Sequence, residues 1–245
     1  MIARCLLAIL APALAAAQPA PAFEVASLKP HPGEITYSAD PAIKGSQVVA
    51  TAVTLLDLLT YAYGVRYDQL DGAPPWARSE HYDLLAKGPG DRPPTPAEAR
   101  QMVQTLLADR FHLQMHRETR DLPVYALVVA KGGHKLKPST ADATGNNGTT
   151  AGPKGMHMEF TRGTTEALAS QLSNSAGRPV VNRTGLDGYW AYTFDWIPAN
   201  RPVTGESDAP SMFTAIQEQL GLKLEPAKAP FAMLIVDRAE RPSQN

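Results

Sequence analysis

The chain has 245 residues and a formal net charge of −1, so it lacks the cationic surface that attracts nucleic acid. Its single cysteine, Cys5, excludes an internal disulfide and any site built from several cysteines. The length is enough for one large domain or two small ones.

Residues 1–17, MIARCLLAILAPALAAA, have the pattern of a secretory signal peptide. Arg4 precedes an apolar run, and three alanines follow it in the manner of a cleavage site. The run is shorter than the roughly 20 residues that a membrane-spanning helix needs. We therefore expect an exported chain that begins near Gln18, in the periplasm or outside the cell, with no transmembrane segment.

The pattern of residues 18–136 predicts a first unit of strand–helix–strand–helix–hairpin. The expected elements, in chain order, are a strand at 46–53, helices at 54–64 and 97–110, with a strand at 81–88 between them, and a hairpin at 111–129. Thr95, Pro96 and Glu98 form a capping box with proline at the first helical position. Gly64 suits a left-handed helix end.

A second unit with the same order is predicted over residues 156–245. Its strands are expected at 155–160 and 189–196, its helices at 164–177 and 210–220. Residues 110–129 and 219–236 also align, with Phe111 on Leu220 and Pro123 on Pro230. We interpret the chain as a duplicated α+β domain, each copy a small mixed or antiparallel sheet packed by two helices. Residues 137–155, rich in small polar residues, are expected to be a flexible linker.

The segment FHLQMHRE, residues 111–118, raises the question of a metal site, because His112 and His116 are four residues apart. Apolar and polar residues alternate strictly here, which predicts a half-buried strand. Residues four apart on a strand lie ~13 Å from each other, too far to share one ion. We expect no metal site and no cofactor.

Catalytic motifs are sparse. The sequence has no G-x-S-x-G and no S-x-x-K motif. Asp57, Asp83, Glu118 and Asp195 could pair for acid–base chemistry, but they fall on different predicted elements. Among the aromatic residues, Trp76 follows a Pro-Pro pair in a loop and is the best candidate for an exposed contact. Tyr63 and Tyr82 lie near it in sequence, so these three form the predicted ligand-binding set.

Long motifs give the chain a family resemblance. They are FEVASLKP at 23–30, TLLDLLTYAYG at 54–64, the run at 106–133, GRPVVNRTGLDG at 177–188 and the run at 213–225. The chain resembles an uncharacterised exported family from soil-dwelling acidobacteria, also found fused to BlaR-type membrane metallopeptidases. The resemblance implies no catalytic residue, and the fusion implies sensing or interaction outside the cytoplasm.

Export, duplication and the lack of a reactive motif favour a non-enzymatic protein that binds a peptide, an envelope polymer or a protein partner. The alternative is a hydrolase of envelope or other polymers that uses carboxylates in a cleft between the two units. A purely structural accessory domain is a third hypothesis.

Overall fold

The computed structural model describes residues 20–35, 37–152, 155–198 and 209–242. The expected signal peptide, residues 1–17, lies outside the described residues. The chain divides into two compact units. Unit 1 comprises Met1–Tyr67, Gly72–Met115 and Val236–Asn245, and unit 2 comprises Asp68–Asp71 and His116–Ile235. Helices and three small, mostly antiparallel sheets give the chain the predicted α+β fold class.

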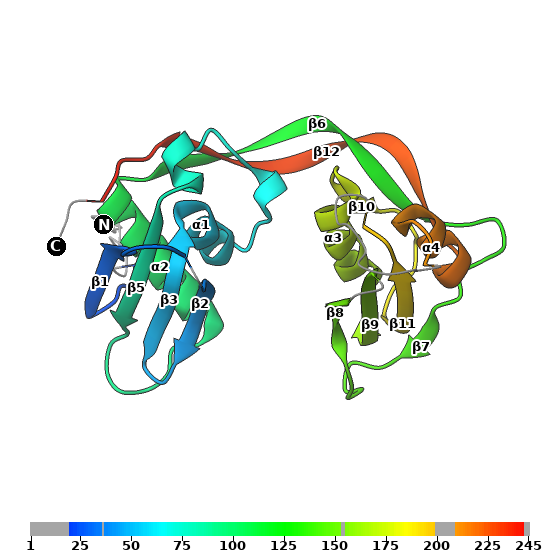
Figure 1. The fold of residues 1–245 in the computed structure, drawn as a ribbon, viewed down its shortest axis with the longest axis horizontal. Helices are drawn as coiled ribbons and strands as arrows, with labels where there is room; N and C mark the ends of the chain where they lie inside the picture. Colours follow the sequence, from blue (N-terminus) through cyan, green and yellow to red (C-terminus); the bar gives the residue numbers. More distant parts are fainter. Residues whose placement is uncertain (1–19, 36, 153–154, 199–208, 243–245) are drawn as a thin grey trace, which may run out of the picture. The chain divides into compact units, whose positions relative to one another are not determined.

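Unit 1 contains an antiparallel sheet in the order β1-β5-β3-β2 (Figure 1). Along β5, Tyr82 and Leu84 are buried, whereas Leu85 is 52% exposed, so one face of the sheet belongs to the core and the other is open. The elements of this unit are β1 (Val25–Pro30), β2 (Ala39–Lys44), β3 (Gln47–Thr54), α1 (Leu55–Tyr63), β5 (His81–Lys87) and α2 (Pro96–Phe111), with short 3₁₀ turns at Tyr67–Gln69 and Pro75–Arg78.

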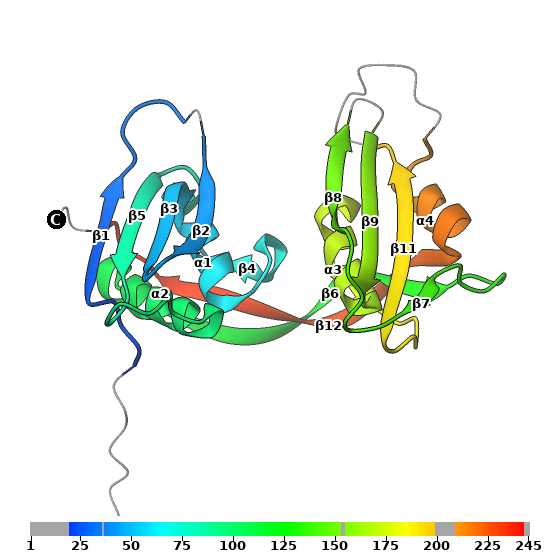
Figure 2. The same ribbon diagram turned by 90° about the horizontal axis from the view of Figure 1, so that it is seen from below.

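Unit 2 contains a second antiparallel sheet, in the order β7-β11-β9-β8 (Figure 2). The inward side chains Tyr192, Phe194 and Trp196 of β11 pack with Leu168 and Ile216 in one hydrophobic cluster. The elements are β7 (Lys137–Ser139), β8 (Asn147–Gly152), β9 (Gly155–Gly163), α3 (Thr165–Ala176), β11 (Tyr189–Trp196) and α4 (Met212–Leu220).

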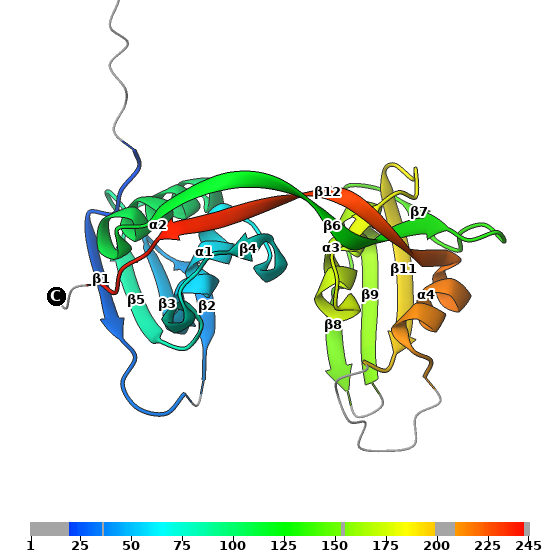
Figure 3. The ribbon, with the colours of Figure 1, turned by 90° about the horizontal axis from the view of Figure 1, so that it is seen from above.

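A third sheet has the order β10-β6-β12-β4, and its two long central strands lie side by side (Figure 3). Its strands are β4 (Leu70–Asp71), β6 (Gln114–Val129), β10 (Val180–Asn182) and β12 (Leu222–Arg238). The outer strands β4 and β10 both pair in parallel, β4 with β12 and β10 with β6.

The hairpin prediction for residues 111–129 is wrong. Phe111 ends α2, His112 is its left-handed cap, and β6 then runs without a turn from Gln114 to Val129. A two-residue hairpin turn needs residues with positive φ, and none occurs in this strand. The equivalent β12 is also continuous, and the two long strands satisfy each other's backbone groups.

Residues 137–155 were expected to be a linker, and the structure differs there. They contain β7 and β8, which are the two outer strands of the unit 2 sheet. All six residues of β8 are exposed, so backbone pairing with β9 places this strand rather than side-chain burial. A hydrophobic pattern cannot reveal a strand of that kind.

The strand order in the sheet of unit 1 becomes that of unit 2 when six is added to each strand number. The order β1-β5-β3-β2 becomes β7-β11-β9-β8, and the third sheet maps onto itself with β6 and β12 exchanged. A bulge recurs too. Between Ala50 and Val53, strand β3 carries one residue more than β5, and β9 does the same between Phe160 and Gly163 opposite β11.

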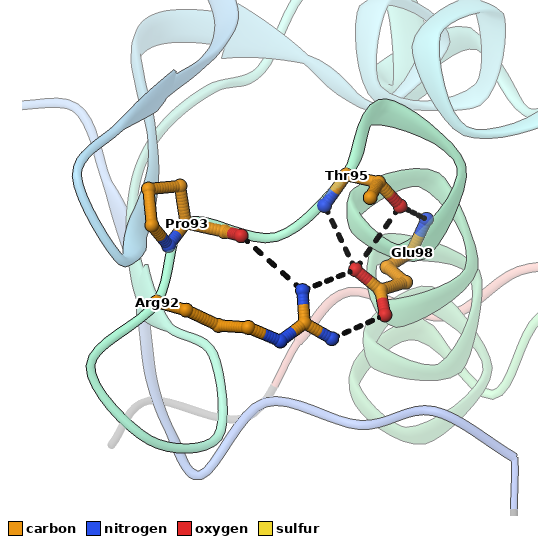
Figure 4. A network of polar contacts seen from close by, with 4 residues as sticks. All are labelled: Arg92, Pro93, Thr95 and Glu98. Carbon is orange, nitrogen blue, oxygen red and sulfur yellow. Dashed lines mark hydrogen bonds and ion pairs between the residues drawn. The ribbon is translucent and has the colours of Figure 1, made fainter.

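The predicted capping box at Thr95 and the predicted left-handed helix end at Gly64 are confirmed. Thr54 forms a second capping box, at the start of α1, which was not predicted. Figure 4 shows the α2 cap, where the Glu98 carboxylate accepts from Thr95 and from the Arg92 guanidinium, at 2.9 and 2.5 Å from its two Nη atoms. The hydrogen bond from Arg92, with smaller contributions from those of Thr95, lowers the pKa of Glu98 to about 2.

Candidate functional site

Groove 1 is a hollow of about 540 Å³ on the open face of the unit 1 sheet. Three strands supply two side chains each, namely Ser27 and Lys29 from β1, Val49 and Thr51 from β3, and Asp83 and Leu85 from β5. Ser27 and Leu85 are cross-strand partners, as are Lys29 and Asp83. The groove therefore has a floor formed by the aliphatic side chains of Val49 and Leu85, together with one ammonium, one carboxylate and two hydroxyl groups.

Asp83 is a polar group of groove 1 that contacts within the fold hold in place. Its Oδ1 accepts from the backbone N–H of Ala52 at 2.9 Å and lies 2.9 Å from Nδ1 of His31. Ala52 is the bulged residue of β3, buried, with a φ of 50° that non-glycine residues rarely adopt. The bulge thus aims its amide at Asp83, and Oδ2 of this carboxylate has no partner among the described residues.

Groove 2 is a hollow of about 310 Å³ on the unit 2 sheet. Its lining includes Lys135 and Lys137 from β7 and the segment before it, Glu159 and Thr161 from β9, and Ala191 and Thr193 from β11. Oε2 of Glu159 accepts from the side chain of Asn146 at 2.9 Å. As in groove 1, the second carboxylate oxygen has no partner in the described parts of the chain.

The strand registers make the two grooves equivalent, residue by residue. Lys29 lies opposite Asp83, and Lys137 lies opposite Ala191. Val49 lies opposite Leu85, and Glu159 lies opposite Thr193. With both bulges aligned, the six residues of groove 1 correspond in order to Lys135, Lys137, Glu159, Thr161, Ala191 and Thr193. The two grooves therefore occupy one and the same position in the fold.

Two polar groups are identical in the two grooves. The lysine recurs as Lys29 and Lys137, within the tripeptide Leu-Lys-Pro in each case, and the threonine recurs as Thr51 and Thr161. Both lysines are exposed, and neither forms an ion pair or hydrogen bond with any described residue. Each groove also keeps one carboxylate, but on different strands, Asp83 on β5 and Glu159 on β9.

The apolar floor differs between the grooves. In groove 1 it consists of Val49 and Leu85, and Val25 on the same sheet is 66% exposed. Glu159 and Thr193 take the corresponding positions in groove 2, and Lys135 replaces Ser27. Groove 1 thus has an aliphatic floor and balanced charges, whereas groove 2 has polar side chains at those floor positions and two cations against one anion.

The predicted ligand-binding residues lie elsewhere in unit 1. The ring of Trp76 stacks on Phe111 at 6.2 Å between centroids, and Tyr82 meets Phe111 edge-on at 5.6 Å. Tyr82 is only 2% exposed, and Tyr63 is partly buried in the last turn of α1. None of the three lines groove 1, and their ligand-binding role stays a prediction.

Arg241 connects the end of the chain to this aromatic cluster. Its guanidinium lies 5.4 Å from the centre of the Trp76 ring, and its Nε donates to Oε1 of Glu80 at 2.8 Å. The bond from Arg241 lowers the pKa of Glu80, whose other oxygen accepts from Tyr82. Burial raises the pKa of Tyr82 to about 12, and the hydrogen bond that Tyr82 donates to Glu80 adds to this shift. The polar groups of Arg241, Glu80 and Tyr82 are therefore engaged with one another.

The residues weighed for metal binding and acid–base chemistry are separated. His112 pairs with Glu240 at 3.3 Å, and His116 lies 4.0 Å from Glu118. Over residues 20–242, apart from the gaps, no three or more His, Cys, Asp or Glu side chains gather as a metal site would require. Asp57 caps α1, Asp83 lies in groove 1, Glu118 pairs with Arg120, and Asp195 pairs with His157.

Sequence reasoning did not identify Lys29 and Lys137 as site residues. The signal was the repeated Leu-Lys-Pro at 28–30 and 136–138, which the interpretation of 137–155 as a linker concealed. Alignment of the first strand of each unit would have found it.

The fold and grooves define an α+β protein with two open-faced sheets, each carrying a groove at the equivalent position. The chain belongs to the family described as Protein of unknown function (DUF3738), which matches over residues 56–239. No curated protein and no solved structure matches it. None of the described helices is long and apolar enough to cross a membrane.

Proposed function

We propose that the protein is a non-enzymatic, exported peptide-binding protein that uses groove 1 and groove 2 as two equivalent sites. The observation that carries the proposal is the recurrence, at equivalent positions of both sheets, of a threonine and of a lysine without a partner among the described residues, with one half-satisfied carboxylate elsewhere in each groove. These groups supply a donor and an acceptor at each site, which are what a peptide main chain requires.

The hydrogen bond at the β3 bulge does not require Asp83 to be charged. In unit 1 the bulge amide of Ala52 donates to Asp83, and in unit 2 the equivalent amide of Arg162 donates to Oδ1 of Asn147 at 3.0 Å. A neutral amide oxygen therefore satisfies this bulge as well as a carboxylate does. The negative charge and the contact with His31 are additions to the fold, which favours a role in binding.

The spacing of the grooves suits an extended peptide. Their side chains repeat every ~6.6 Å along a strand and every ~4.8 Å between strands. An extended peptide presents alternate side chains with the same ~6.6 Å repeat. A polysaccharide lacks this repeat and therefore matches the groove less well. Binding of a polysaccharide is one outcome of the test below.

We infer further that the two halves are repeated copies, as the sequence alignment predicts. The matching strand order, the shared bulge and the equivalent grooves all support this. Two sites on one chain would strengthen binding to a ligand that offers a segment to each groove. Envelope-bound peptides and partner proteins with several extended segments meet that condition.

Export and the family setting are part of the same proposal. The signal pattern of residues 1–17 supports a periplasmic or extracellular location. The resemblance to acidobacterial proteins, some fused to BlaR-type membrane metallopeptidases, supports a role in sensing or interaction outside the cytoplasm.

The rival hypothesis, a hydrolase, finds little support in the grooves. Asp83 and Glu159 lie in different grooves, so neither site holds a pair of carboxylates. In groove 1, Ser27 and His31 are four residues apart along an extended segment, which separates them by ~13 Å. A nucleophile and its base need hydrogen-bonding distance.

A binding screen with charge-reversed variants tests the proposal. The mature protein is applied to an array of immobilised extended peptides and, in parallel, to insoluble polysaccharides. We expect peptide retention that falls at least tenfold in the double variant Lys29→Glu, Lys137→Glu. The matched control Lys131→Glu changes an exposed lysine outside both grooves and should bind as the parent does. Retention on polysaccharide alone, or peptide retention unaffected by the double variant, would overturn the proposal.

A further inference from the structure

We infer that the two grooves select different side chains, groove 1 an aliphatic one and groove 2 an acidic one, so that each chain binds two chemically distinct peptide segments. This inference rests on the proposed function. It comes from the positions at which the equivalent grooves differ.

Groove 1 offers apolar surface that the fold leaves uncovered. Leu85 is 52% exposed and faces Val49 across the β3–β5 pair. Covering such surface with an aliphatic side chain is favourable, at roughly 25 cal/mol per Å² of apolar area buried. An acidic side chain placed on the same floor would lose hydration, and the Asp83 carboxylate in the same groove would offset its attraction to Lys29.

The charges of groove 1 balance one another. Lys29 and Asp83 are cross-strand partners with no ion pair of 4.0 Å or less between them, and His31 contacts Oδ1 of Asp83. A donor and an acceptor on neighbouring strands can bind the C=O and N–H groups of a neutral main chain. The ligand of groove 1 is therefore an uncharged, aliphatic, extended segment.

Groove 2 has the opposite character. The positions of the aliphatic floor are taken by Glu159 and Thr193. Two lysine ammonium groups, those of Lys135 and Lys137, stand against one carboxylate, so the groove has a net positive charge. The Lys135 ammonium donates to the carbonyl of Glu218, whereas Lys137 has no partner among the described residues. An acidic side chain would meet net positive charge here, and no aliphatic side chain stands at the positions equivalent to Val49 and Leu85. The ligand of groove 2 is therefore an extended segment with Asp or Glu.

An exchange of floor residues tests the inference. In the double variant Val49→Glu, Leu85→Thr, groove 1 acquires the residues of groove 2. In Glu159→Val, Thr193→Leu, groove 2 acquires those of groove 1. Each new residue already occupies the equivalent position of the other unit, so both variants should fold, which thermal unfolding verifies.

Two short peptides of equal length serve as probes, one with valine and leucine at alternate positions and one with glutamate there. Amide chemical-shift titrations of the mature protein report binding at β5 and β11 separately. We expect a preference of about fivefold or more for the aliphatic peptide at β5 and for the acidic peptide at β11, exchanged in the two variants. Equal affinity of both peptides at both strands would overturn the inference and keep the proposed function. Absence of any shift with either peptide would overturn both.

Discussion

Gly221 and His112 occupy the same position, the left-handed C-cap of the second helix of each unit. We predict that Gly221→Ala destabilises unit 2 strongly. A Cβ at this position would lie 2.2 Å from the carbonyl oxygen of Gly133 and 3.0 Å from Cα of His134. The neighbouring backbone cannot move aside freely, because Ala130 N–H donates to the carbonyl of Gly221 and Gly133 N–H to that of Ala130.

The magnitude follows from these contacts. A non-glycine residue in the left-handed region costs about 1–2 kcal/mol, and each backbone hydrogen bond that the displaced loop loses costs about 1 kcal/mol. We expect a loss of about 3 kcal/mol in the free energy of unfolding. For a chain of this size that corresponds to a fall of about 6–12 °C in the melting temperature, measurable by circular dichroism or calorimetry.

His112→Gly is the control at the equivalent position. It relieves a φ of 46° and removes an exposed contact with Glu240, so we expect a change of no more than about 1 kcal/mol in either direction. If Gly221→Ala melted within a degree or two of the parent protein, the close approach of the 130–135 segment to α4 would be refuted.

Three further predictions concern the charges and rings of unit 1. Arg241→Gln should leave the melting temperature nearly unchanged, because the Arg241 side chain is 62% exposed and a surface ion pair contributes little, and thermal unfolding will measure this. Glu98 has a lowered pKa, so its ionisation stabilises the fold fully above pH 4.5 and this stabilisation is lost as the pH falls towards about 2; acid unfolding of Glu98→Gln should lack that pH dependence. Tyr82 has a raised pKa, so the stability that it contributes is complete below pH 10 and is lost as the pH rises through about 12, and Tyr82→Phe should remove the corresponding late step from a tyrosinate absorbance titration.

Local signals carried much of the fold. The capping box at Thr95 and the glycine end of α1 were readable because each depends on residues close in sequence. The strands β5 and β11 were readable because alternate side chains are buried.

Elements that depend on partners far along the chain were not predicted. The exposed strand β8 is held by pairing with β9, and β6 runs through the segment predicted as a hairpin because β10 and β12 pair with it. No local pattern of residues records such pairing.

The grooves escaped prediction for the same reason. Lys29, Thr51 and Asp83 are spread over more than fifty residues of sequence, and only the registers of β1, β3 and β5 bring them together. The aromatic residues near Trp76 were proposed instead because their clustering is visible in sequence. In the structure, Trp76 and Tyr82 pack on Phe111.

The number of peptide sites per chain tests the central claim most directly. Calorimetric titration of the mature protein with an extended peptide that carries both aliphatic and acidic side chains should give two sites per chain. Lys29→Glu and Lys137→Glu should each remove one site and leave the other unchanged. A single site, or two sites that persist in both variants, would contradict the account.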